Sequence, residues 1–278
     1  MKKTVWLLAC SIATLISCHR LNSPNQIVAR TYKSQQKLRI SAHRGNSGLA
    51  PENTLATFQK TLDMGVDFIE IDVRTSKDNQ LVILHDGTLN RTTNGTGPIS
   101  NLTLTEIKQL KANKGWETQF PDERIPTLEE TLQLVSSWNK ERNTKTYIYV
   151  DCKQVDPKPL VQLMRKYRLD KESVYYGNDD FLVRLKAEDP QSKRMPSLDK
   201  AEEMERKIAQ IAPYAFDVNW LQLSPQLVKD IHQKNIRVFS DALGPLDQEK
   251  NYQKAKELGI DLIQTDHVKS VYRYFLGK

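Results

Sequence analysis

Residues 38–73 read "LRISAHRGNSGLAPENTLATFQKTLDMGVDFIEIDV" and contain two short apolar runs separated by one helical pattern. The runs at 38–43 and 66–73 are typical of buried strands, whereas 53–64 has the apolar spacing of an amphipathic helix. A strand, a helix and a second strand in this order predict two parallel strands joined by a crossover helix. This unit indicates how the rest of the chain is built.

The same alternation continues to the end of the chain. Six further segments predict strands, at 146–152, 173–176, 193–196, 214–218, 236–240 and 260–265. Helical patterns lie between them, for example at 127–140, 157–168, 199–210, 224–234 and 247–258. Eight strand–helix units in a chain of 278 residues, with no clear second core, predict a single α/β domain over 38–278, a (β/α)8 TIM barrel.

One segment, 76–126, departs from this alternation. It contains the apolar run 81–84 and then many turn residues. We expect a hairpin that returns beside the second strand, followed by a small insertion over the barrel mouth. A turn near 77–79 would place His85 beside the second strand's acidic residues.

Charged and polar residues gather at the predicted strand ends. They are His43 and Arg44 after the first strand, Glu70 and Asp72 in the second, His85 in the hairpin, and Asp151 and Lys153 in the third. Residues two apart in a strand share one face, and TIM-barrel active sites lie at the carboxyl ends of the strands. Each residue alone has an ordinary structural explanation. Together, three carboxylates and two histidines indicate a hard divalent cation bound by oxygen atoms and flanked by an acid–base pair. The arginine and the lysine supply positive charge suited to a phosphate.

The composition excludes few classes of function. The hydrophobic fraction of 38% is sufficient for a large core, and the formal net charge is +7. A mildly basic chain is compatible with simple solubility, and also with attraction to anionic substrates or lipid headgroups. We expect no nucleic-acid partner.

The N-terminus, "MKKTVWLLACSIATLISC", begins with two lysines and continues with an apolar run at 5–16. That run is too short for an ordinary transmembrane helix, so 1–17 is typical of an export signal. The residues 15–18 resemble the bacterial lipobox, which implies cleavage before Cys18 and attachment of lipid to its sulfur. An ordinary secretory signal cut near the same place is the alternative.

We expect the exported protein to be a lipoprotein of the bacterial cell envelope, anchored to the membrane in the periplasm or at the cell surface. Residues 18–37 would form a flexible tether, with a root-mean-square span of roughly 25 Å. Of the three cysteines, only Cys152 would remain free, so no intramolecular disulfide is expected.

Three longer motifs are recognisable: "HRGNSGLAPENTLATF" at 43–58, "GVDFIEIDVRTSKDNQLVILHDGTLNRTTNGTG" at 65–97 and "GIDLIQTD" at 259–266. They closely resemble the glycerophosphodiester phosphodiesterase family. The resemblance implies a (β/α)8 barrel that hydrolyses small glycerophosphodiesters to glycerol 3-phosphate and an alcohol, using one divalent cation, Ca²⁺ or Mg²⁺. It also implies roles for particular residues: His43 and His85 as the acid–base pair, Glu70, Asp72 and Asp151 as metal ligands, and Arg44 and Lys153 as phosphate-site cations.

Two positions depart from the family pattern. Asp151 stands where the family usually has glutamate, which shortens the reach of this ligand by one methylene. Near the end of the seventh predicted strand many members carry a tryptophan that packs on the substrate, whereas this chain reads "VFSDALG". We expect Phe239 to replace that ring and Asp241 to alter what the pocket accepts.

Two other functions remain open from sequence. A related phospholipase-type phosphodiesterase acting on lysolipids or phosphoinositides would need an extended apolar rim, yet the apolar residues of 76–126 are scattered among polar ones. A non-catalytic surface-binding lipoprotein would be expected to have lost a catalytic histidine or an acidic ligand. The expected histidines and acids are all present.

Overall fold

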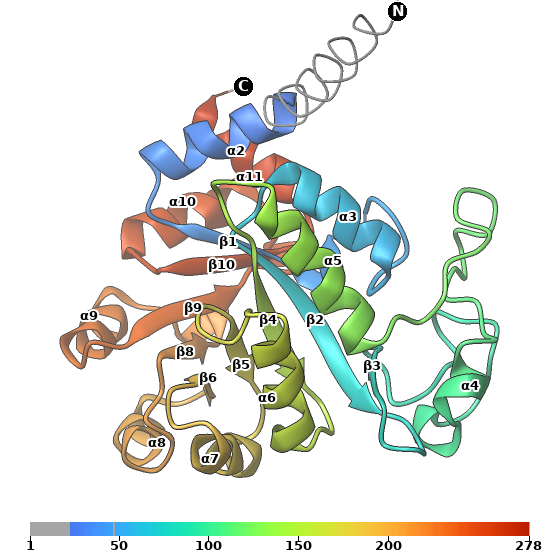
Figure 1. Cartoon of the computed structure of the whole chain (residues 1–278). Coiled ribbons are helices and arrows are strands. Elements are labelled where there is room, and N and C mark those ends of the chain that lie inside the picture. The colour runs from blue at the N-terminus through green and yellow to red at the C-terminus, as the bar shows by residue number, and fades with distance from the viewer. Residues whose placement is uncertain (1–22, 47, 278) are drawn as a thin grey trace, which may run out of the picture.

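The barrel predicted from sequence is confirmed. The computed structural model describes residues 23–46 and 48–277, and its parallel strands form one ring covered by helices (Figure 1). The strands are β1 (Arg39–Ala42), β2 (Phe68–Thr75), β4 (Tyr147–Cys152), β5 (Val174–Tyr176), β6 (Lys193–Met195), β7 (Ser197–Leu198), β8 (Ala215–Val218), β9 (Arg237–Asp241) and β10 (Leu262–Thr265). Each lies within two residues of a predicted strand.

The predicted strand at 193–196 is divided in two by Pro196, which has no N–H to donate to a sheet. The part before Pro196, β6, pairs with β5, and the short strand β7, which follows the predicted range, pairs with β8. The strand order therefore runs from β6 through β1 to β7, so its two ends are neighbours in the chain. The backbone N–H of Asp217 donates to the carbonyl of Pro196 at 3.0 Å and helps to close the ring.

The barrel interior is filled by side chains rather than open. One buried layer takes a residue from each of seven strands: Phe68, Val174, Met195, Ala215, Phe239, Leu262 and Tyr149. This is the packing expected inside a TIM barrel. The layer forms a floor below the carboxyl ends of the strands.

The outer helices lie between the strands, as the alternation predicted. They are α3 (Leu55–Met64), α5 (Leu128–Lys140), α6 (Pro157–Lys166), α7 (Asp179–Glu188), α8 (Met204–Ile211), α9 (Pro225–Gln233), α10 (Glu249–Leu258) and α11 (Val268–Leu276). The predicted start of α9 is confirmed, because the Ser224 hydroxyl accepts from the N–H of Leu227 at 3.2 Å and Pro225 follows it. Helices α7 and α11 were not among the predicted ones.

The expected flexible tether is wrong for most of its length. Residues Pro24–Gln35 form helix α2, which packs on α3 and α11 (Figure 1). The Gln26 amide donates to the carbonyls of Leu62 and Asp63 at 3.1 and 3.0 Å, and the buried Tyr32 hydroxyl donates to Leu38 at 2.8 Å. The predicted signal at 1–17 and Cys18 lie outside the described residues. No described helix has the length and apolarity needed to cross a membrane.

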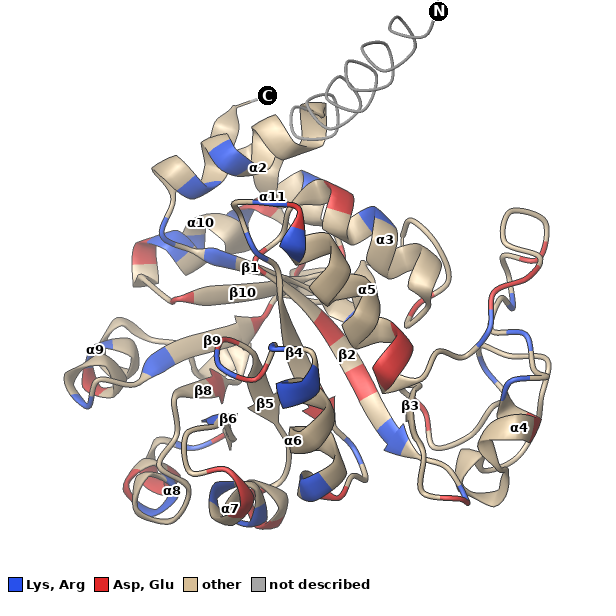
Figure 2. Cartoon of the chain, in the orientation of Figure 1, with Lys and Arg blue, Asp and Glu red and all other residues tan. Residues whose placement is uncertain are grey.

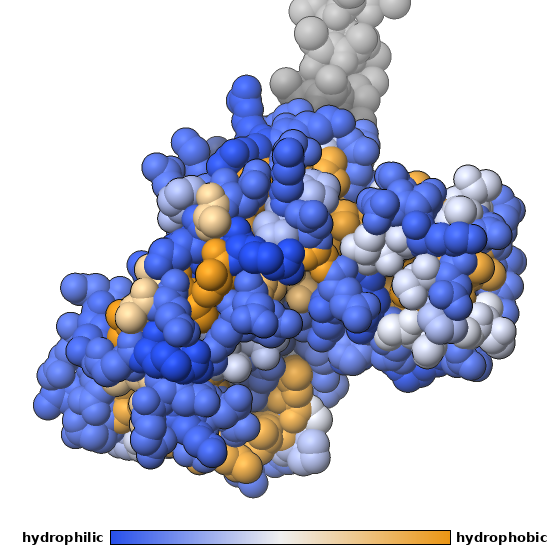
Figure 3. Space-filling model, turned by 90° about the horizontal axis from the view of Figure 1, so that it is seen from below, coloured by the Kyte–Doolittle hydropathy of each residue, from blue (hydrophilic) through white to orange (hydrophobic). Residues whose placement is uncertain are grey.

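The predicted hairpin is confirmed. Strand β3 (Leu81–Ile83) runs antiparallel to β2, with Val73 opposite Ile83. The rest of 76–126 forms a lobe beside the barrel that includes the short helix α4 (Leu104–Ile107) (Figures 1 and 3). The lobe has a small core of its own: Val82, Leu84, Leu89, Ile99, Ile107, Ala112 and Ile125.

Candidate active site

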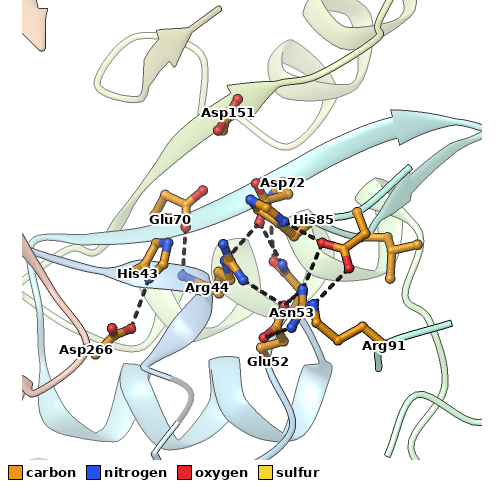
Figure 4. Close-up of polar contacts among 12 residues, drawn as sticks. His43, Arg44, Glu52, Asn53, Glu70, Asp72, His85, Arg91, Asp151 and Asp266 are labelled. Carbon is orange, nitrogen blue, oxygen red and sulfur yellow. Dashed lines mark hydrogen bonds and ion pairs between the residues drawn. The ribbon is translucent and has the colours of Figure 1, made fainter. Parts of the chain in front are cut away.

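Three carboxylates meet at the carboxyl ends of two neighbouring strands. Glu70 and Asp72 lie two residues apart on β2, and Asp151 on β4 is the register partner of Asp72. One oxygen of each carboxylate lies within 4.8 Å of the others. Glu70 and Asp72 are only 2% and 1% exposed. The sequence predicted this carboxylate triad, and the structure brings all three residues together (Figure 4).

Burial and mutual repulsion oppose the ionisation of the triad. Burial, followed by the charges of Asp72 and Asp151, raises the pKa of Glu70 well above its ordinary value. Burial and Asp72 likewise raise the pKa of Asp151. Lys153 offsets part of this repulsion, because its Nζ contacts Asp151 at 2.5 Å and Asp72 at 3.2 Å.

The donor set fits a hard divalent cation. All three groups present carboxylate oxygens, which are the ligands that Ca²⁺ and Mg²⁺ prefer. The one nearby sulfur, in Cys152, follows Asp151 on the strand and therefore points to the opposite face, where it is buried in the apolar core. A thiolate-bound metal is thus not what this site would hold.

His43 lies in a turn directly after β1, and an acid fixes its ring. Its Nδ1 contacts Oδ1 of Asp266 at 2.9 Å, at the end of β10. Burial opposes ionisation of Asp266, but the hydrogen bond and charge of His43 outweigh it and lower the pKa of Asp266. A carboxylate bound to Nδ1 favours the tautomer in which Nε2 can accept a proton. Figure 4 places this ring beside Glu70.

His85 has an equivalent support on the other side of the triad. Its Nδ1 contacts Oδ1 of Asp86 at 2.7 Å. Hydrogen bonds from Arg91 lower the pKa of Asp86 strongly, so this acid stays ionised. The predicted placement of His85 is confirmed, since Leu84 pairs with the carbonyl of Asp72 and Figure 4 shows the ring beside Asp72.

Arg44 is held by its backbone as well as by its side chain. It has a positive φ of 48°, which is uncommon for a residue other than glycine, and its N–H donates to Glu70 at 2.7 Å. The guanidinium donates to Glu52 at 3.1 Å. Its buried Nε forms no hydrogen bond among the described residues but lies 3.8 Å from Oδ2 of Asp72, so the guanidinium is also paired with the triad.

The next residue, Gly45, makes this backbone path possible. Its φ is +78°, and a Cβ at this position would lie 2.6 Å from Thr57 and 2.7 Å from Phe58. Only glycine avoids both the left-handed strain and the clash. The turn that carries His43 and Arg44 is therefore packed directly on α3.

Sequence reasoning missed three supporting residues. The Asn53 amide donates to Asp72 at 2.7 Å, while the next residue, Thr54, caps α3. Glu52 joins Arg44 to Arg91, which donates to it through two nitrogens at 2.8 Å each. The motif "PENT" was a signal for Glu52 and Asn53, whereas nothing in the local sequence marks Arg91.

One predicted site residue does not reach the mouth. Phe239 is fully buried in the floor layer, with its ring centroid 6.4 Å from that of Phe68. It lies two residues before Asp241, and hence one interior layer lower on β9. The expectation that its ring packs on the substrate is therefore wrong. Asp241 takes the upper position instead.

Two acids without a cationic partner lie across the barrel from the triad. Asp217 on β8 and Asp241 on β9 form no ion pair among the described residues. Burial raises the pKa of Asp217 well above its ordinary value, with Asp241 and Asp151 adding to the effect. Burial also raises the pKa of Asp241, to about 6. The mouth thus has a second acidic wall.

Comparison with known proteins agrees with this geometry. The sequence model described as "Glycerophosphoryl diester phosphodiesterase family" matches residues 43–270. The chain is 28% identical to a glycerophosphodiester phosphodiesterase of Caldanaerobacter subterraneus, over 83% of this chain and 94% of that protein. It is 30% identical to a glycerophosphodiester phosphodiesterase of Bacillus altitudinis, over 82% and 94%.

Two solved structures share the fold. A phosphodiesterase of Oleispira antarctica, in complex with the product sn-glycerol-3-phosphate, superposes with a TM-score of 0.76 at 25% identity, covering 85% of this chain and 96% of that one. A glycerophosphodiester phosphodiesterase of Agrobacterium tumefaciens superposes with a TM-score of 0.72 at 27% identity, covering 82% and 96%.

Proposed function

This chain belongs to the glycerophosphoryl diester phosphodiesterase family, and from that premise we propose that it hydrolyses glycerophosphodiesters to an alcohol and glycerol 3-phosphate with the help of one divalent cation. The observation that carries the proposal is the buried carboxylate triad, which lies between two histidines that are each bound to an aspartate (Figure 4). The product named for the Oleispira enzyme supports the same reaction.

The cation would be held by Glu70, Asp72 and Asp151, and we propose Ca²⁺ or Mg²⁺. When bound, it offsets the charge of the phosphate and polarises the bonds of the phosphodiester. Asp151 is shorter than glutamate, and its carboxylate is also shared with Lys153.

The phosphate would be oriented by Arg44 and Lys153. The guanidinium of Arg44 lies at the edge of the triad, with its Nε 3.8 Å from Asp72, while Glu52 and the Glu70 carboxylate fix the rest of the residue. Lys153 is 24% exposed at its side chain, so its ammonium can also be reached from the mouth. Two fixed cations of this kind suit a diester that carries one negative charge.

The two histidines would move the protons. The glycerol hydroxyl next to the ester attacks phosphorus, so that its P–O bond forms while the bond to the alcohol breaks. One histidine takes the hydroxyl proton, and the other donates a proton to the departing alcohol. Water then opens the cyclic phosphate with the two roles exchanged, which returns both rings to their initial protonation states.

A panel of glycerophosphodiesters tests the reaction. We expect release of glycerol 3-phosphate, loss of activity after exhaustive chelation and recovery with Ca²⁺ or Mg²⁺. A substrate with its neighbouring hydroxyl methylated should bind without reacting. Full activity after chelation would exclude the metal role, and ordinary hydrolysis of the methylated substrate would exclude the cyclic route.

We also propose that Cys18 carries a lipid that anchors the protein in the bacterial cell envelope. The support is sequence alone: the cysteine ends an apolar run and follows a lipobox-like tripeptide. Labelling with a tagged fatty acid tests it, and Cys18→Ser should abolish the label. Labelling that persists in the variant would exclude Cys18 as the acylated residue, whatever the enzymatic activity.

A further inference from the structure

A groove outside the barrel shares no residue with the active site. It has a volume of about 190 Å³ and lies between helices α2 and α11, with the end of α3 forming part of its floor. Its apolar lining comes from Val28 of α2, Met64 of α3, and Tyr272 and Leu276 of α11. The groove is partly open to solvent.

The edge of this groove is positively charged. Lys269 and Arg273 lie four residues apart on α11, so both side chains are on the same side of the helix, and both line the groove. Both are exposed, and in the described part of the chain neither forms an ion pair. The charges of these two side chains are therefore available to bind an anion.

The two helices contain no acidic residue that could neutralise this edge. The sequence of α2 is "PNQIVARTYKSQ" and that of α11 is "VKSVYRYFL". Figure 2 shows α2 with basic positions and without acidic ones, in contrast to helices such as α7 and α8, which carry both. The combined face therefore attracts anions.

The chain enters the domain at this face. Helix α2 begins at Pro24, and five residues separate it from Cys18, the residue proposed to carry a lipid. A lipid on Cys18 would therefore hold the start of α2 close to the membrane.

We propose that the α2–α11 face binds the surface of a bilayer containing anionic phospholipid, with Lys269 and Arg273 on the headgroup phosphates and apolar lipid atoms in the groove. The proposal is independent of the proposed reaction. It requires only that the face meets anionic lipid, for which the charge and the apolar groove fit, and the proposed anchor at Cys18 would keep this face near the membrane.

Vesicle binding of the full chain tests this surface. We compare vesicles of phosphatidylcholine with vesicles that also contain phosphatidylglycerol, so that any contribution of the apolar run is common to both. We expect tighter binding to the anionic vesicles, weakening as salt is raised. A basic residue at a membrane surface contributes about fivefold to affinity, so Lys269→Gln with Arg273→Gln should remove about 25-fold of the anionic preference.

A control variant removes the same number of positive charges from another part of the surface. Lys229→Gln with Lys234→Gln removes two exposed lysines at α9, which Figure 1 places away from α2 and α11. This variant should retain the preference, and both double variants should hydrolyse a soluble diester at the wild-type rate.

The proposal is overturned by equal binding to both vesicle types, or by equal losses in the two double variants. Concentration-dependent dimerisation that Lys269→Gln with Arg273→Gln abolishes would assign the face to a second copy instead.

Discussion

Single residues at the barrel mouth do more than one task each. Glu70 belongs to the carboxylate triad and also accepts the backbone N–H of Arg44, while Asp72 is bound by Asn53 and Lys153. A substitution at one of these positions therefore changes both the charge of the site and the position of its neighbours. Substitutions of side chains without such shared contacts test one role at a time.

The two histidines should both be required for turnover. His43→Ala and His85→Ala should each lower kcat by about 10² to 10⁴ or more, because each ring transfers a proton in the proposed reaction. The binding of glycerol 3-phosphate, measured by calorimetry, should change much less. A His85→Ala variant with near-normal kcat would show that this ring does not act as an acid or base.

Removal of one buried charge should stabilise the metal-free protein. Unfolded Glu70 titrates near 4.5 and the folded group titrates higher. Between these values the folded state holds the extra proton, so the free energy of unfolding contributed by Glu70 falls as pH rises. Glu70→Gln should therefore raise the metal-free Tm at pH 8 relative to wild type, with a smaller difference at pH 4.

The same variant should lose the stabilisation by Ca²⁺ or Mg²⁺, because binding to the native state alone raises Tm. Lys158→Gln, on the exposed side of α6, is a control that should leave both effects unchanged. Equal metal-dependent shifts of Tm in Glu70→Gln and wild type would exclude Glu70 as a ligand.

The acidic wall opposite the triad should influence which alcohol is accepted. A cationic alcohol, as in glycerophosphocholine, would be attracted by Asp241, whereas a neutral one would not. Asp241→Asn should therefore lower kcat/KM for glycerophosphocholine by about tenfold, equivalent to about 1.4 kcal/mol, relative to glycerophosphoglycerol. Competition between the two substrates in one reaction measures this ratio, and an unchanged ratio would contradict the role.

At the scale of elements, local sequence patterns correctly predicted the features that are determined by residues nearby in the chain. The pairs Glu70–Asp72 and Asp151–Lys153 were placed correctly because side chains alternate along a strand. Phe239 was misplaced because alternation gives the face of a strand, not the depth within the barrel. Helix α2 was missed because one of its buried residues, Gln26, is polar and is satisfied only by carbonyls of α3. Arg91 likewise depends on a distant partner, Glu52.

Docking of α2 should contribute measurably to stability. Tyr32 is 1% exposed, packs edge-on against Tyr272 at 5.1 Å, and donates to Leu38. Tyr32→Ala should lower the free energy of unfolding by about 3–5 kcal/mol, as for other large aromatic truncations. Ser34→Ala, on the exposed side of the same helix, should have little effect. Equal losses by denaturant unfolding in both variants would mean that α2 is not docked through Tyr32.

At the scale of the whole molecule, the residues that stabilise the barrel and the residues of the proposed active site occupy different levels of the barrel. The floor layer with Phe68 and Phe239 lies beneath the polar mouth, so that the acids rest on an apolar base. The insertion lobe brings its own core and supplies His85, Asp86 and Arg91 to one side of the mouth. The family motifs predicted where the polar mouth lies, because these motifs are densest at strand ends and in the hairpin.

The docking of α2 also sets how far the catalyst could travel. If the protein is anchored at Cys18, only the residues up to Ser23 separate the lipid from a helix fixed to the barrel. Fully extended, five residues span at most about 18 Å, less than the span expected for a free coil over 18–37. The domain of such an enzyme would stay within a short distance of its lipid anchor. Its rate of turnover would therefore depend on the diffusion of substrates to the membrane surface rather than on movement of the enzyme.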